Sequence, residues 1–150
     1  MTSSEVNAML SELAQAMNWV NGACGYFVSG RGIVVESDLV YPGDSIIQNL
    51  FAQHQAAHKI VCDSMSAIYS NQKAAEAAAP AAESGATAGA VSNLTNAYDA
   101  AMAALQAGKA ALNTQLDTME AIKARIEELK AKELEDNLGS TGTPSTPGTP

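Results

Sequence analysis

Apolar residues return every seven positions along one proline-free stretch of this chain, residues 91–129. Two rows of this heptad repeat can be followed along the stretch. The first row consists of Val91, Tyr98, Leu105, Leu112, Met119 and Ile126, and the second contains Leu94, Ala101, Ile122 and Leu129. A heptad spacing kept over so many turns predicts a long helix with one continuous apolar face, which needs a partner along its length.

Two residues interrupt the second row. Gly108 stands at one of its positions, where the missing side chain would let a neighbouring helix approach closely. Gln115 stands at the next, and a polar residue on a heptad face often fixes the register of the helices at some cost in stability. We therefore expect the first part of this helix to be closely packed and its charged last part, up to about residue 134, to project.

A second heptad row precedes the first in the chain and predicts a second long helix over residues 44–79. Asp44 or Ser45 can cap its amino end, and Pro80 follows its last residue. The row consists of Ile47, His54, Val61, Ile68 and Ala75, with Leu50, Phe51, Ala57 and Met65 beside it. Residues 80–90 are small and include proline and glycine, which predicts a loose connector. The two helices are thus expected to form an antiparallel, coiled-coil-like helical hairpin.

The first 43 residues predict a shorter helix followed by a small β-hairpin. An apolar face at three- and four-residue spacing indicates a helix over residues 4–20, and Gly22 and Gly25 favour its end. Residues 26–28 and 33–35 are short β-prone runs on either side of a glycine-containing turn. Pro42 and Gly43 then break the second strand.

These elements predict a mainly α protein with one helical assembly domain, residues 1–138. Its parts are an amino-terminal helix with a β-hairpin (1–43), a helix (44–79), a connector (80–90) and a second long helix (91–138). Residues 139–150 contain only Gly, Ser, Thr and Pro. Because this segment has no aliphatic or aromatic side chain to bury, it is expected to be a disordered tail.

Charge and hydropathy argue against nucleic acid and membrane as partners. The formal net charge is −8, and the eight Lys and Arg residues are scattered apart from a small group near residue 125. Phosphate binding requires clustered cations, and a membrane-spanning helix requires a much longer apolar run. The first residues lack the basic segment of a Sec signal peptide. A virion, or an assembly exported by another route, is the expected location.

His54, His58 and Cys62 follow one another at four-residue spacing and therefore line one side of a helix. Neighbouring members could share a zinc ion with ligands from elsewhere, although the first and third lie about 12 Å apart along the axis. A histidine packed on the helical interface is the favoured interpretation. We therefore expect no metal and no cofactor, and keep a metal-dependent domain as an alternative.

The sequence also predicts a protein that is not an enzyme. His54 and His58 are the only histidines, and no nucleophile motif accompanies them. The glycines match neither a phosphate-binding loop nor a dinucleotide-binding motif. No catalytic residue is assigned.

Cys24 and Cys62 are the only cysteines and lie in no metal-binding motif. They are expected to be two buried or idle thiols, with one disulfide as the alternative. An inter-subunit bridge is one form of that alternative, and it would require an oxidising compartment.

The favoured function is a non-enzymatic structural subunit that associates with itself through its helical faces, as in a virion, decoration, spike or filament component. Other structural proteins of the same assembly are the expected further partners. The alternative is an adaptor, chaperone or exported partner protein whose coiled coil is completed by a different chain. The residues predicted to form the interface are Leu105, Leu112, Met119, Ile122, Ile126 and Leu129.

Overall fold

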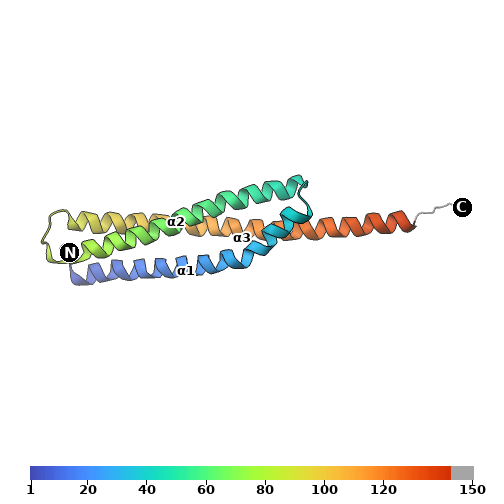
Figure 1. Cartoon of the computed structure of the whole chain (residues 1–150). Coiled ribbons are helices and arrows are strands. Elements are labelled where there is room, and N and C mark those ends of the chain that lie inside the picture. Colours follow the sequence, from blue (N-terminus) through green and yellow to red (C-terminus); the bar gives the residue numbers. More distant parts are fainter. Residues whose placement is uncertain (143–150) are drawn as a thin grey trace.

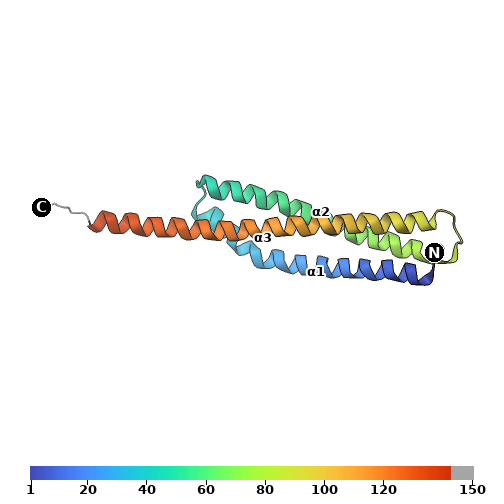
Figure 2. The ribbon, with the colours of Figure 1, turned by 180° about the vertical axis from the view of Figure 1, so that it is seen from behind.

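A computed structural model describes the backbone of residues 1–142 and the side chains of residues 1–24 and 41–138. Within them the chain forms the helices α1 (Ser3–Val40), α2 (Ser45–Ser84) and α3 (Ala90–Gly142). Figures 1 and 2 show that α2 runs antiparallel to α3, that α1 lies along both, and that α3 extends past the other two. The predicted mainly α fold with a long antiparallel hairpin is confirmed.

The start of α2 is defined by its cap. Asp44 has an extended backbone, and its Oδ2 accepts a hydrogen bond from the backbone N–H of Ile47 at 3.0 Å. This bond satisfies one of the amide groups that have no partner in the first turn of a helix. The backbone N–H of Asp44 also donates to the carbonyl of Tyr41, which closes the short turn between α1 and α2.

The connector predicted over residues 80–90 is shorter in the structure. α2 continues through Pro80 to Ser84 and ends at Gly85, whose φ of 71° lies in the left-handed region that suits glycine. Proline costs a helix one backbone hydrogen bond. Ala79 and Ala82, on either side of Pro80, are buried against the other helices, and this packing outweighs the loss.

The predicted β-hairpin is wrong. Residues 26–35 belong to α1, and the described backbone contains no strand. An isolated two-stranded hairpin is marginally stable in water. Extending a helix that already exists avoids the cost of nucleation, so α1 runs on past Gly22 and Gly25, where the sequence predicted its end.

The carboxyl-terminal boundary also differs from the prediction. α3 continues through residues 139–142, which the sequence assigned to a disordered tail. Backbone hydrogen bonds to the preceding turns allow a helix to propagate even through Gly and Ser. Residues 143–150, the rest of the predicted tail, lie outside the described residues.

The core between α2 and α3 follows the heptad rows. On α2, Ile47, Val61, Ile68 and Ala75 are buried as predicted. On α3 the second row is buried from Leu94 through Ala101, Gly108 and Gln115 to Ile122, and its last member, Leu129, is half-buried. The first row is less buried at the amino end of α3. Its first member, Val91, is 40% exposed, and its second, Tyr98, packs against the cluster that contains residues of α1.

α1 covers one side of the α2–α3 pair. Val6 and Leu13 join a core cluster with Leu94 and Ala101 of α3, and Ala16 and Val20 pack with Ile68 of α2. At the edge of this contact the hydroxyl of Tyr98 donates a hydrogen bond to the carboxylate of Glu12. The first helix is therefore an integral part of a three-helix arrangement.

Gly108 lies where side chains of α1 and α2 approach the backbone of α3 closely. A Cβ atom at this position would lie 2.5 Å from Cη2 of Trp19 and 2.9 Å from Cβ of Ser64. These distances are shorter than side chains tolerate, so the contact requires glycine. The predicted close approach at Gly108 is confirmed, and it involves both α1 and α2.

Candidate functional site

A layer of polar side chains crosses the middle of the α2–α3 pair. Gln115 and Thr118 of α3 are 2% and 4% exposed, and they face His54 and His58 of α2. Nε2 of Gln115 lies 3.4 Å from Nε2 of His54 and 3.3 Å from Nδ1 of His58. Nδ1 of His54 lies 3.2 Å from Oγ1 of Thr118. The two predicted histidines thus converge on one glutamine.

The donors and acceptors of this layer define its protonation state. An amide Nε2 can only donate, so Nε2 of His54 and Nδ1 of His58 act as acceptors toward Gln115. His54 then carries its proton on Nδ1 and donates to Thr118, whose hydroxyl donates to the backbone carbonyl of Gln115 at 2.8 Å. His54 is therefore neutral.

Burial reinforces this state at His54. Its pKa is lowered, first because burial disfavours the charged imidazolium and also because His58 lies nearby. Oε1 of Gln115 is buried without a hydrogen-bond partner. An unsatisfied buried oxygen lowers stability, so the layer favours one helix register at an energetic cost.

The same set of donors explains why a metal ion is not assigned here. Both nitrogens of each imidazole face protein atoms, and Nε2 of His58 lies 3.5 Å from Sγ of Cys62. Among the described side chains, no three His, Cys, Asp or Glu groups lie close enough together to hold a metal ion. The alternative of a metal-dependent domain therefore gains no support from this geometry.

The two cysteines lie near each other, on α1 and α2. Sγ of Cys24 lies 3.7 Å from Sδ of Met65, and Cys62 is three residues before Met65 on α2. Both thiols are free, with Cys24 exposed and Cys62 half-buried. The pKa of Cys62 is raised, first by burial and then by the charges of Asp63 and Cys24.

The predicted interface residues have packing partners within the chain. Leu105 and Leu112 are half-buried against side chains of α1 and α2, including Trp19 and Met65. Met119, Ile122 and Ile126 are buried. Ile122 and Ile126 pack against Ile47 at the start of α2, and Leu129 is half-buried in the same cluster.

Apolar side chains remain exposed where α3 leaves the other helices. The hydroxyl of Tyr41 donates to Glu133 at 3.3 Å, which marks the end of the bundle along α3. Beyond this point Leu134 and Leu138 are 61% and 62% exposed. Their four-residue spacing places them on one side of the projecting helix.

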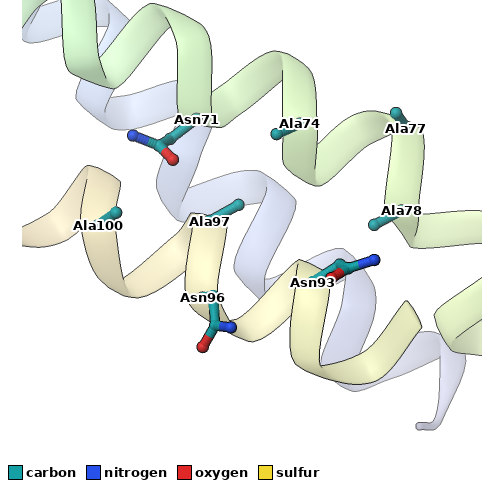
Figure 3. Close-up of a pocket in the computed structure, with 8 residues that line it drawn as sticks. All are labelled: Asn71, Ala74, Ala77, Ala78, Asn93, Asn96, Ala97 and Ala100. Atoms are coloured by element: carbon teal, nitrogen blue, oxygen red, sulfur yellow. The ribbon is translucent and has the colours of Figure 1, made fainter. Parts of the chain in front are cut away.

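A second surface feature is a groove between α2 and α3, with α1 behind it (Figure 3). Its volume is about 700 Å³, and no lining residue is charged. The lining consists of Asn71, Ala74, Ala77 and Ala78 of α2 with Asn93, Asn96, Ala97 and Ala100 of α3. These short side chains leave the two helix backbones accessible from this side.

Sequence reasoning did not include Thr118 or the pair formed by Asp44 and Arg125 among the important residues. Thr118 follows Gln115 by three residues and therefore shares its helix face, a signal that the heptad pattern already contained. The partner of Asp44 had no such signal, because Arg125 is distant in the sequence.

Comparisons with protein-family models, with curated proteins and with solved structures give no match to this chain. Within the described residues, no helix has the length and apolarity needed to cross a membrane.

Proposed function

We propose that this protein is a non-enzymatic structural subunit that associates with copies of itself through helical surfaces, as a component of a virion, decoration, spike or filament. The observation that carries the proposal is the projecting end of α3, where Leu134 and Leu138 are exposed. The interface predicted over residues 105–129 is largely occupied by α1 and α2, so the proposed contact moves to residues 134–138.

The charges around these leucines favour a second copy in antiparallel orientation. Lys130 and Lys132 precede Leu134, whereas Glu135 and Asp136 follow it. When two such helix ends pair antiparallel about Leu134, Lys132 of one copy lies opposite Asp136 of the other, and Glu133 lies opposite Glu135. A parallel arrangement brings every charge opposite a like charge instead. The antiparallel arrangement therefore has fewer like-charge contacts.

The projecting contact is short, and stable association requires more buried area than these few turns offer. The uncharged groove between α2 and α3 supplies a second surface of the right shape, because small side chains let another helix approach closely. Repeated contacts of these two kinds would build an extended assembly.

Sedimentation velocity of the full chain over a range of concentrations tests this proposal. We expect concentration-dependent association, weakened at least tenfold by Leu134→Glu combined with Leu138→Glu. Ile60→Glu is the matched control, since Ile60 is also an exposed apolar side chain, on α2. A strict monomer with full helix content, or equal effects of both changes, would contradict the proposal.

A second candidate is an adaptor, chaperone or exported partner protein that completes a helical bundle with a different chain. It is favoured by the groove between α2 and α3, which faces away from α1 and is lined by several residues of each helix. Circular dichroism distinguishes this candidate, because helix content would then rise when the partner is added. Full, cooperatively melting helix in the isolated chain would argue against it.

A further inference from the structure

We propose that Cys24 and Cys62 form a thiol–disulfide exchange site that covalently joins α1 to α2 within one chain. The inference does not depend on self-association, since it concerns how the first helix is held on the other two. Both thiols are free in the structure, and the proposed bond forms within one chain rather than between subunits.

The contact between Cys24 and Met65 places Cys24 beside the turn of α2 that precedes Met65 and carries Cys62. Sγ of Cys24 contacts Sδ of Met65 at 3.7 Å, and Cys62 lies three residues earlier on the same helix, about 4.5 Å along its axis. Residues flanking both cysteines share one core cluster, in which Ala23 of α1 packs with Val61 of α2. The helices are therefore held in contact at this level.

The two cysteines differ in the way an exchange reaction requires. Cys24 is exposed, so a small disulfide such as oxidised glutathione reaches it first, whereas Cys62 is half-buried. Nε2 of His58 lies 3.5 Å from Sγ of Cys62, so a polar group adjoins the thiol that reacts second.

The reaction proceeds in two exchanges. The Cys24 thiolate attacks the small disulfide, forms a mixed disulfide and releases one small thiol. The Cys62 thiolate then attacks the Cys24 sulfur and expels the second small thiol, which takes up the proton lost by Cys62. Two protein thiols are thus oxidised while one small disulfide is reduced to two thiols.

The bond would act on the weaker contact of the fold. α2 and α3 pack along their length, whereas α1 is attached through separate clusters around Leu13 and Ala23. Joining residues so far apart in the sequence restricts the unfolded chain and stabilises the folded one. Oxidation would hold α1 on the hairpin more firmly than the packing of the reduced form alone.

Oxidation of the full-length protein by glutathione at low micromolar concentration tests the site. Intact mass under non-reducing conditions should show a monomer lacking two hydrogens, and peptide mapping should join the peptides of Cys24 and Cys62. The urea midpoint of the oxidised form should exceed that of the reduced form. Cys62→Ser should instead retain a glutathione adduct on Cys24, with no increase in the midpoint.

Met65→Leu is the matched control, because it keeps the packing volume and both thiols and should still form the bond. A wild-type monomer carrying glutathione on both cysteines would overturn the inference. So would a disulfide-linked dimer as the main product, or a linked monomer whose urea midpoint equals that of the reduced protein.

Discussion

The guanidinium of Arg125 donates two hydrogen bonds to the carboxylate of Asp44, from Nη2 to Oδ1 at 2.8 Å and from Nε to Oδ2 at 3.1 Å. Asp44 is also the cap of α2, so one carboxylate both begins that helix and ties it to α3. Both side chains are largely shielded from solvent. This geometry makes the pair more than an exposed surface contact.

Substitution of Asp44 separates its two roles. Asp44→Asn keeps a good helix cap but removes the ion pair, whereas Asp44→Ala removes both, so the alanine variant should be the less stable. The pKa of Asp44 is lowered, chiefly by its hydrogen bonds with Arg125. Its contribution is therefore present above the ordinary Asp pKa and is lost as pH falls through the lowered value. Urea unfolding at pH 7 and pH 3 should show the wild type and Asp44→Asn converging in acid.

Gly108→Ala should destabilise the protein by about 1–3 kcal/mol, because the new methyl group collides with Trp19 and Ser64. Gly22→Ala is the matched control, since nothing lies within 4 Å of its added Cβ, and it should stabilise the helix by about 0.5–1 kcal/mol. Denaturant unfolding measures both changes. In a Trp19→Leu background the cost of Gly108→Ala should fall, and an unchanged cost would contradict this explanation.

His54 makes stability depend on pH. Because burial lowers its pKa in the folded protein, protons bind more readily to the unfolded chain. Stability from this group is present above the unfolded pKa, about 6.5, and declines as pH falls through that value. Thermal melting from pH 8 to pH 5 should therefore show a falling midpoint. His54→Gln should flatten the decline, and an equal slope in both proteins would exclude His54 as its source.

Gln115→Glu tests the neutral state assigned to His54. A buried carboxylate beside this neutral imidazole should cost about 2–5 kcal/mol at pH 8. At pH 5 a protonated His54 can donate to it, so the cost should shrink. Gln115→Leu is the control without this pH dependence. Unfolding free energies of the three proteins at both pH values provide the measurement.

The heptad rows predicted which residues of α2 and the middle of α3 face each other, because that spacing is a property of any paired helix. They could not show that Leu105 and Leu112 pack against α1, since a half-buried leucine is equally suited to another chain. The polar layer was visible only in part. His54 and Gln115 were each recognised as unusual heptad residues, but their contact depends on the register of the hairpin.

Local preference misled where the tertiary context was stronger. The β-prone residues 26–35 continue a helix that was already nucleated, and Pro80 lies within α2 because its neighbours Ala79 and Ala82 are buried. In a helix interior, Gly costs about 1 kcal/mol and Pro about 3 kcal/mol relative to Ala. The packing of the flanking turns offsets these costs.

The sequence by itself determined that this protein is built from long helices paired through heptad faces, since the repeat is encoded residue by residue. The tertiary structure decided that α1 is a third member of the bundle, that Arg125 reaches Asp44, and that Leu134 and Leu138 are exposed on the projecting end of α3. Periodicity states that a helix face needs a partner. The relative lengths and offsets of the three helices determine which helix packs on that face and which side chains stay exposed.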